Sequence, residues 1–231
     1  MYWNEEIKAI LFDLDDTLVN SKKAEYNAIC EFKKLYSVFD EVKDNDIAQI
    51  WNNITMENYE KYHKGEISFE ELRTKRMKEL FTNYSINISK EDAKNKFKDY
   101  QKIYEKNWIL FDDAEEALKT LKSKYKLVIL SNGDGKQQRK KIEYTGLNKY
   151  FTNIVISSEV GYSKPEKEIF DIACRMVNLE PKNCVMIGDK YKVDIEGAIN
   201  AGMHGIWVNR KNEHSNYEYQ IEELIELTKY L

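Results

Sequence analysis

The stretch Ile7-Lys8-Ala9-Ile10-Leu11-Phe12-Asp13-Leu14-Asp15-Asp16-Thr17 decides the fold of this chain. Residues 7–14 are almost all apolar, which is typical of a strand buried on both faces of a parallel sheet. Three carboxylates and a hydroxyl gather where this strand should end. In open parallel sheets the carboxyl ends of the strands are where ligands bind, so the stretch indicates both a sheet and a site.

Three other apolar runs also lead into polar residues. Residues 127–130 precede Ser131-Asn132-Gly133, residues 154–156 come before Lys164-Pro165, and residues 185–187 precede Gly188-Asp189, with Asp194 five residues further on. Each segment alone is compatible with an ordinary loop. Together they place four carboxylates, one hydroxyl and one ammonium at strand ends, which indicates a site for phosphoryl transfer.

The chain changes character twice. Residues 20–106 hold a single glycine and no proline, and show helical spacing with start signals at Ser68-Glu71, a capping box, and at Ser89. From about residue 108 strands and helices alternate. We therefore predict an α/β fold: a doubly wound parallel-sheet core from residues 1–18 and 108–231, and an inserted all-helical domain of four or five helices at residues 19–107.

In the second part of the core the pattern predicts specific elements. Strands are expected at 127–130, 153–157, 184–187 and 205–208. A helix is expected at 136–144, ended by Gly146; others should begin at Pro165, in its favoured first position, and span 195–201, ended by Gly202. A closing helix is expected at 218–231.

Bulk properties exclude several classes. The length of 231 residues and the 42% hydrophobic content suit one domain with an insertion. A net charge of −4 without a basic stripe argues against a nucleic-acid partner, and Arg139-Lys140-Lys141 is interpreted as a solvated helix face. The start of the chain lacks a signal peptide's basic region, and no stretch is apolar enough to span a membrane. Three cysteines without a CxxC pattern are expected to be buried free thiols, so a cytoplasmic location is expected.

With these residues in view, the chain resembles the haloacid dehalogenase superfamily, on its phosphatase side. The superfamily's first motif, DxDx[TV], matches Asp13 to Thr17, and its second, a Ser or Thr after a strand, matches Ser131. Its third, a lysine before a helix, matches Lys164, and its fourth, GDxxxxD, matches residues 188–194. A helical insert between the first two motifs resembles the C1 cap class. The endings Asn200-Ala201-Gly202-Met203 and Trp207-Val208-Asn209 resemble the pyrimidine 5'-nucleotidase and N-acylneuraminate-9-phosphatase branch.

The resemblance implies a role for each motif residue. Asp13 would be the nucleophile that forms an aspartyl-phosphate, and Asp15 would protonate the leaving oxygen and then activate water. Ser131, with the backbone N–H groups of Asn132 and Gly133, would bind phosphate, and Lys164 would add a positive charge there.

A Mg²⁺ cofactor is also implied by the resemblance. The carboxylates of Asp13 and Asp189 and the backbone carbonyl of Asp15 would hold the ion, since Mg²⁺ prefers hard oxygen ligands. Asp194 would lie behind these ligands, holding a metal-bound water or Lys164; it is also a candidate N-cap of the following helix. Asp16 is expected in the loop and Thr17 in a local hydrogen bond.

The function predicted is a Mg²⁺-dependent phosphatase acting on a small phosphate ester, with a nucleoside 5'-monophosphate as the expected substrate. Trp51, Tyr59 and Tyr62 could stack on a base, but their position on one helix face favours the core of the helical insert. Arg73 and Arg76 could meet a substrate anion or lie on a salt-bridged helix surface. A sugar-phosphate phosphatase and a phosphomutase remain alternatives. A 2-haloacid dehalogenase and a receiver-like phosphoacceptor fit less well, because neither needs the acid/base Asp15 together with Asp189.

Overall fold

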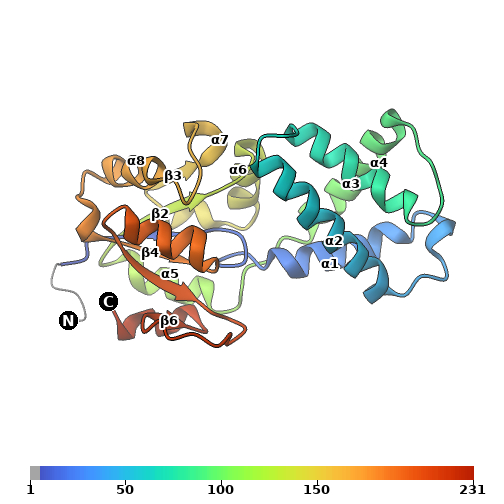
Figure 1. Ribbon diagram of the computed structural model, residues 1–231. Coiled ribbons are helices and arrows are strands. Elements are labelled where there is room, and N and C mark those ends of the chain that lie inside the picture. The colour runs from blue at the N-terminus through green and yellow to red at the C-terminus, as the bar shows by residue number, and fades with distance from the viewer. Residues whose placement is uncertain (1–5) are drawn as a thin grey trace. The chain divides into compact units, whose positions relative to one another are not determined.

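The computed structural model describes residues 6–231, so residues 1–5, on which the expectation about a signal peptide rests, lie outside the described part (Figure 1). The chain divides into two compact units. One holds the segment that ends at Asn20 together with Ile109–Leu231, and the other is Ser21–Trp108. Each unit is described by itself.

The unit Ser21–Trp108 is helical. It contains four α-helices and one 3₁₀ turn at Ser37–Phe39: α1 (Ser21–Lys33), α2 (Asp44–His63), α3 (Phe69–Thr82) and α4 (Lys90–Lys106). The capping box predicted at Ser68 and Glu71 is present at the start of α3, and the Ser89 hydroxyl accepts from the Asp92 N–H at the start of α4. Both predicted helix starts are therefore confirmed.

Aromatic side chains form the core of the helical unit. Trp51 is 1% exposed, and its Nε1–H donates to the hydroxyl of Tyr100 at 2.9 Å. The Arg76 guanidinium lies 4.3 Å from the centre of the Trp51 ring and donates to Thr55 Oγ1 at 2.6 Å. The interpretation of Trp51 as core is therefore confirmed, and the alternative of a stacking surface for a base is wrong, because the Trp51 ring already contacts Tyr100 and Arg76. Arg76 likewise lies in the core and not on a salt-bridged surface.

The other unit is built on one parallel sheet. Its strands are β1 (Ala9–Phe12), β2 (Lys126–Ser131), β3 (Asn153–Ile156), β4 (Cys184–Gly188), β5 (His204–Val208) and β6 (Gln220–Ile221). They lie in the order β3-β2-β1-β4-β5-β6, and every neighbouring pair is parallel. The chain winds outward from β1 through β2 and β3, then crosses to β4. The winding therefore reverses between β1 and β4, which confirms the doubly wound fold.

Helices connect the strands of this sheet. They are α5 (Ala114–Lys122), α6 (Gly135–Tyr144), α7 (Ser157–Val160), α8 (Lys167–Val177), a π-helical turn at Tyr191–Glu196 and α9 (Gly197–Asn200). Short 3₁₀ turns lie at Leu147–Lys149, Pro181–Asn183 and Leu224–Lys229. As predicted, α6 ends before Gly146, whose φ of 69° is the left-handed conformation that glycine favours.

Side chains alternate between the two faces of the sheet. In β1, Ile10 and Phe12 join the cluster that packs against α5, whereas Ala9 and Leu11 join the cluster that packs against α8. All four are fully buried, which explains the continuous apolar run that begins the chain.

Two element predictions are wrong. The chain from residue 218 onward is not a helix: Gln220 and Ile221 pair with β5 as a sixth strand, and a 3₁₀ turn follows. Ile221, Leu224 and Leu227 are spaced as on one face of a helix. In the structure Ile221 lies on β6 and the two leucines lie in the 3₁₀ turn, and all three pack into the core cluster on one face of the sheet. Helix α8 begins at Lys167 and not at Pro165, because a turn closed by the Glu166 N–H to the Ser163 carbonyl comes first.

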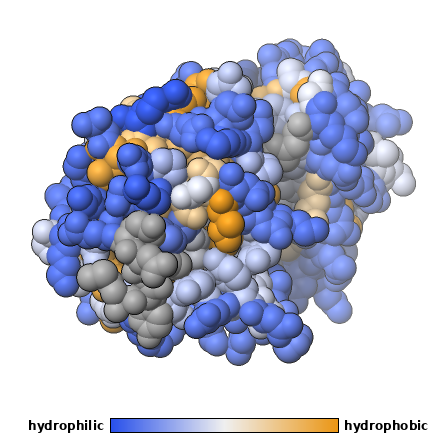
Figure 2. Space-filling view, turned by 60° about the vertical axis from the view of Figure 1, so that its left-hand side comes forward, coloured by the Kyte–Doolittle hydropathy of each residue, from blue (hydrophilic) through white to orange (hydrophobic). Residues whose placement is uncertain are grey.

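The surface view in Figure 2 is mostly hydrophilic, with hydrophobic residues in small groups. Within residues 6–231 no helix is long and apolar enough to cross a membrane. The three cysteines are free and buried, as predicted. The interpretation of residues 139–141 as a solvated face holds for the exposed Arg139 and Lys140 but is wrong for Lys141, which is 2% exposed.

Trp51→Ala should lower the free energy of unfolding by about 3–5 kcal/mol, the usual cost of truncating a buried tryptophan. It also leaves the Tyr100 hydroxyl without its donor. Urea unfolding followed by circular dichroism measures the loss. Met56→Ala, at a position of the same helix that is 65% exposed, is the control and should change little. A Trp51→Ala protein as stable as the control would show that the indole does not support this core.

Candidate active site

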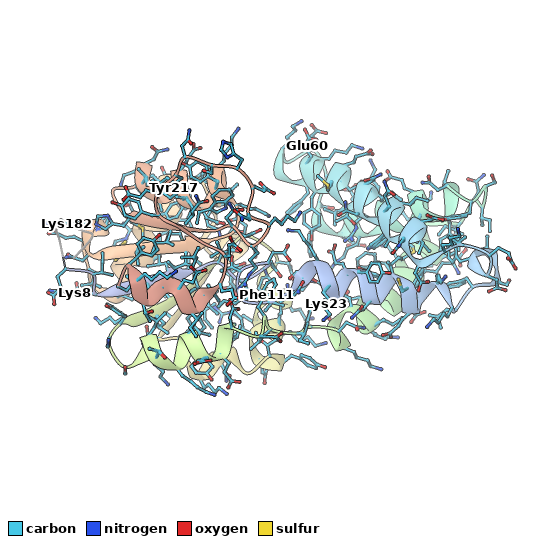
Figure 3. All side chains as sticks on the ribbon, turned by 90° about the horizontal axis from the view of Figure 1, so that it is seen from below. Lys8, Lys23, Glu60, Phe111, Lys182 and Tyr217 are labelled. Atoms are coloured by element: carbon cyan, nitrogen blue, oxygen red, sulfur yellow. The ribbon has the colours of Figure 1, made fainter. Side chains whose placement is uncertain are left out.

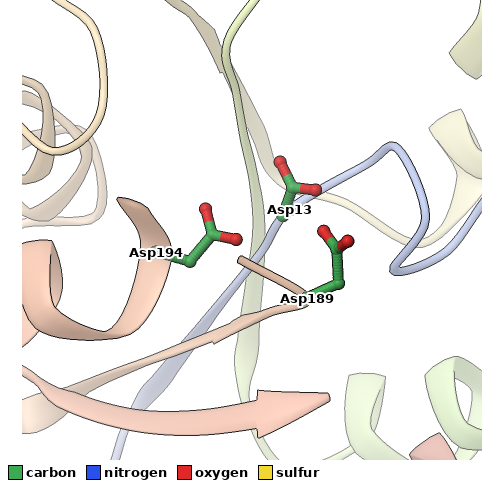
Figure 4. A group of neighbouring side chains, drawn as sticks. All are labelled: Asp13, Asp189 and Asp194. Carbon is green, nitrogen blue, oxygen red and sulfur yellow. The ribbon is translucent and has the colours of Figure 1, made fainter. Parts of the chain in front are cut away.

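Strands β1 and β4 bring two motif carboxylates together. Asp13 directly follows β1 and Asp189 directly follows β4, and the Asp13 N–H donates to the Ile187 carbonyl at 2.8 Å. Both residues therefore stand where the winding of the sheet reverses, the usual ligand-binding position in such folds. In Figure 4 the carboxylates of Asp13, Asp189 and Asp194 converge.

Lys164, which lies between β3 and α8 in the chain, pairs with two of these carboxylates. Its ammonium lies 2.6 Å from Asp13 Oδ1 and 2.7 Å from Asp194 Oδ1. The side chains of Lys164 and Asp194 are 2% and 1% exposed, so these ion pairs are shielded from water. A buried charge is tolerated only with a partner, and here one cation serves two carboxylates.

Burial and mutual repulsion shift the pKa values of these groups. Burial raises the pKa of Asp13 to about 6; Lys164 opposes this shift, and the negative charge of Asp194 adds to it. Burial also raises the pKa of Asp189 to about 7, helped by the charges of Asp13 and Asp194. For Lys164, burial would lower the pKa, but the two neighbouring carboxylates outweigh it and raise the pKa above its usual value. The site therefore holds excess negative charge.

The three carboxylates fit a metal ion. Asp13, Asp189 and Asp194 each offer a carboxylate oxygen, and these oxygens lie within 4.8 Å of one another. An all-oxygen donor set suits a hard cation such as Mg²⁺. A cation would also relieve the repulsion that raises the two aspartate pKa values. The sequence placed Asp194 behind the ligands; the structure places its carboxylate in the same cluster.

Glycine is required before Asp189. A Cβ added to Gly188 would lie 2.4 Å from the Asp194 carboxyl carbon, closer than packed atoms approach. Asp194 lies within the π-helical turn, and its Oδ2 accepts from the Lys190 N–H at 2.9 Å. Asp194 thus holds Lys164, as one expectation had it. The other expectation, that Asp194 is the N-cap of the following helix, is wrong, because Asp194 lies inside the turn and Glu196 precedes α9.

The segment after β2 meets Lys164 through a side chain. Asn132 Oδ1 accepts from the Lys164 N–H at 2.8 Å, and Asn132 Nδ2 donates to the Lys164 carbonyl at 2.9 Å. Ser131, at the end of β2, is 1% exposed. The Gly133 N–H donates to Ser157 Oγ at 3.0 Å. This differs from the expectation that Gly133 presents its N–H to phosphate, because the serine hydroxyl already occupies it.

The loop after Asp13 is held by its own turn. Asp16 has a φ of 62°, and its N–H donates to the Val19 carbonyl at 2.7 Å. Thr17 Oγ1 lies 3.5 Å from Asp13 Oδ2, a long local contact of the kind predicted. Asp15, unlike Asp13, turns its carboxylate to helix α6: Gln138 Nε2 donates to Asp15 Oδ2 at 2.6 Å, and Lys141 Nζ donates to Oδ1.

Four residues at the site were not identified from the sequence. Gln138 and Lys141 bind Asp15, and the Trp207 indole N–H donates to the Asp189 carbonyl at 2.8 Å. Arg210 donates to the Thr17 carbonyl at 3.0 Å and pairs with Asp113, while its guanidinium stacks 3.8 Å from the centre of the Phe111 ring, labelled in Figure 3. Only the spacing of Gln138 and Lys141, one helical turn apart beside motif residues, could have signalled a shared face.

Comparison with known proteins agrees with this geometry. The family model of the haloacid dehalogenase-like hydrolases matches residues 7–202. The chain belongs to this hydrolase family. The matched range runs past Asp194 and therefore includes all three carboxylates of the cluster, Asp13, Asp189 and Asp194.

Some relatives match this hydrolase over most of its length and others over less than half of it. It is 31% identical over 228 residues to N-acylneuraminate-9-phosphatase of Mus musculus, covering 88% of this chain and 83% of that protein. It is 40% identical over 97 residues to pyrimidine 5'-nucleotidase YjjG of Escherichia coli, covering 42% of this chain and 43% of that one. The crystal structure of HAD-hydrolase YfnB from Bacillus subtilis bound to magnesium matches with a TM-score of 0.83 and 25% identity, covering 98% of this chain and 99% of that chain.

Lys164→Met should destabilise the metal-free hydrolase by about 3–5 kcal/mol at pH 8, because it leaves two buried carboxylates without their cation. The folded-state pKa of Asp13 is already raised above its unfolded value, and losing Lys164 raises it further. A group whose pKa is raised on folding favours the folded state as the pH falls through that pKa. The deficit of the variant should therefore shrink from pH 8 to pH 5.5.

Urea unfolding in chelator at both pH values measures this. Lys167→Met removes an exposed lysine paired with Asp171 and should cost about 0–1 kcal/mol at either pH. A Lys164→Met deficit that matches this control, or that grows on acidification, would contradict the electrostatic account.

Proposed function

We propose that this hydrolase is a Mg²⁺-dependent phosphatase that acts on small phosphorylated metabolites through an aspartyl-phosphate on Asp13. The observation that carries the proposal is the Asp13 carboxylate paired with Lys164 beside Asp189 and Asp194, at the reversal of the sheet. The relatives named as a phosphatase and a nucleotidase support the same reaction class. We further propose that the unit Ser21–Trp108 serves as the C1 cap and that the enzyme works in the cytoplasm.

Asp13 is proposed as the nucleophile. One carboxylate oxygen attacks phosphorus, the bond from phosphorus to the leaving oxygen breaks, and the phosphoryl group passes to Asp13. Lys164 holds Asp13 Oδ1 at 2.6 Å, which fixes the orientation of the carboxylate and offsets part of its charge. Ser131 and the backbone N–H of Asn132 are proposed to bind phosphate oxygens.

Asp15 is proposed as the acid and base. It gives its proton to the leaving oxygen in the first step and takes a proton from the attacking water in the second, so it ends each cycle as it began. The water oxygen then bonds to phosphorus as the bond to Asp13 breaks. The Asp15 side chain is 31% exposed, so a proton on Asp15 can reach substrate and water.

The proposed metal ligands are the carboxylates of Asp13 and Asp189 and the backbone carbonyl of Asp15, with Asp194 adjacent. When bound, Mg²⁺ supplies positive charge that lets a phosphate dianion approach a cluster of carboxylates. Lys164 alone is insufficient, because one ammonium faces two carboxylates before any substrate arrives.

The alternative reactions use the site less completely. Dehalogenation needs a nucleophile but neither an acid for an oxygen leaving group nor a metal, so it leaves Asp15 and Asp189 without a purpose. Phosphomutase chemistry uses the same residues and differs in protecting the phosphoryl group from water. The hydrolase relatives favour water as the acceptor.

Two classes of substrate fit the proposed phosphatase: nucleoside 5'-monophosphates and phosphorylated sugars. Trp51 no longer supports a nucleoside 5'-monophosphate as substrate, because its indole is buried in the core of the helical unit and is not available to stack on a base. Tyr59 and Tyr62 are half-buried, with ring centres 6.4 Å apart, and stay candidates. Among the relatives that match over most of their length, one is named as an N-acylneuraminate-9-phosphatase and another as a pyrimidine 5'-nucleotidase. Both substrate classes therefore belong in the same assay.

Magnesium should raise both activity and thermal stability. Chelation should abolish phosphate release and Mg²⁺ should restore it. At a concentration about 100-fold above its dissociation constant, the ion should add about 2.7 kcal/mol of stability. Asp189→Ala should lose the stabilisation seen by differential scanning fluorimetry, whereas Asp171→Ala, which removes a carboxylate paired on the surface with Lys167, should keep it. Full phosphate release in excess chelator would contradict the proposed dependence on Mg²⁺.

A substrate panel separates the remaining classes. Values of kcat/KM for UMP, dTMP, N-acylneuraminate 9-phosphate, a hexose phosphate and phosphoglycolate should show a preference of at least about tenfold, or roughly 1.4 kcal/mol, for one class. Nucleotides leading by that margin would support the expectation from the sequence. Nucleotides that do not lead would end the nucleotidase proposal and leave the general phosphatase in place. No release from any ester with Mg²⁺ would contradict the proposed function itself.

A further inference from the structure

Helix α6 carries two buried polar side chains whose purpose the reaction scheme does not yet explain. Gln138 is 4% exposed and Lys141 is 2% exposed, and they lie one turn apart on the same face of the helix. A lysine is almost never buried this deeply unless it is paired. Its ammonium donates to Asp15 Oδ1.

The contacts of Gln138 complete the arrangement. Gln138 Nε2 donates to Asp15 Oδ2 at 2.6 Å and to Ser131 Oγ at 2.9 Å. An amide nitrogen has two hydrogens, so both are used. Each oxygen of the Asp15 carboxylate thus accepts from α6, and the same glutamine joins Asp15 to the proposed phosphate-binding hydroxyl.

From these contacts we propose that Lys141 and Gln138 are positioning residues that hold the Asp15 carboxylate in register with Ser131 for its two proton transfers. The inference rests on the proposed function, because it assumes that Asp15 is the acid and base. Asp15 lies beyond β1, in a loop whose turn is held by main-chain bonds of Asp16 and Val19. Those bonds hold the main chain, whereas Gln138 and Lys141 on α6 donate to the two oxygens of the side chain.

A structural role alone would not require these residue types. A buried ion pair is often matched or exceeded in stability by apolar residues of similar volume. Proton transfer, however, requires the acid within hydrogen-bond reach of the leaving oxygen, and a shift of about 1 Å can cost roughly 100-fold in rate. Positioning of Asp15 accounts for a buried lysine and glutamine that both point at one carboxylate.

The test compares leaving groups. Phenyl phosphate has a poor leaving group that needs protonation, whereas p-nitrophenyl phosphate has a good one that needs little. The parameter kcat/KM covers the steps up to departure of the leaving group, so hydrolysis of the phosphoenzyme does not mask the comparison. Lys141→Met should lower kcat/KM for phenyl phosphate by about 100-fold, within the range of general-acid contributions, and for p-nitrophenyl phosphate by less than about tenfold.

Lys140→Met is the matched control, because it removes the neighbouring exposed lysine from the same helix and should retain wild-type kinetics. Lys141→Arg keeps a cationic donor and should recover most of the activity on phenyl phosphate. Gln138→Met breaks the other half of the arrangement and should show the same dependence on the leaving group. If circular dichroism shows that Lys141→Met does not fold, the kinetics of Gln138→Met test the inference in its place.

The outcomes separate this inference from the proposed function. A wild-type enzyme that releases no phosphate, or an Asp13→Asn variant that stays active, would overturn the function and the inference with it. An active, Asp13-dependent enzyme in which Lys141→Met behaves like Lys140→Met would overturn the inference alone. Equal losses on both esters without recovery in Lys141→Arg would show that Lys141 only supports the fold.

Discussion

The ammonium of Lys164, buried between Asp13 and Asp194, is the interaction on which the rest of this site depends. One positive charge joins the end of β1 to the turn that follows β4. Asn132 then fixes the main chain of Lys164 from the end of β2. Three strand ends are thereby tied to one lysine. Without it the largely buried carboxylates of Asp13 and Asp194 repel each other with little water to screen them.

The sheet explains why these groups meet. Because β1 and β4 are neighbours across the reversal of the winding, Asp13 and Asp189 need no long side chain to approach each other. Gly188 leaves the space that the Asp194 carboxylate occupies, since any Cβ there would collide with it. Burial raises the pKa of Asp13 and Asp189, and the negative charge of the neighbouring carboxylates adds to both shifts. This charge is a cost to the folded protein and, in the proposed reaction, the reason for a cation.

Sequence reasoning predicted what strand ends and helix starts determine. The apolar run before Asp13 predicted a buried strand, and the structure confirms it. The signals at Ser68 and Gly146 depend on neighbouring residues alone, so the rest of the fold did not change them. Contacts between distant segments were beyond its reach. Lys141 looked like one of three cations on a helix, yet a carboxylate 126 residues away draws it into the core. For Trp51 the sequence left a stacking surface open beside the helix core, and only the contacts with Tyr100 and Arg76 exclude it. The end of the chain has the apolar spacing of a helix, but residues 220 and 221 form a strand because they pair with β5.

The central claim is that Asp13, held by Lys164, attacks phosphorus and carries the phosphoryl group before water does. The stereochemical course at phosphorus tests this most directly, using a phosphorothioate ester made chiral with oxygen isotopes and hydrolysed in water of a third isotope. Two successive in-line displacements, first by Asp13 and then by water, predict net retention of configuration. Net inversion would mean that water attacks the substrate in a single step, and it would contradict the account.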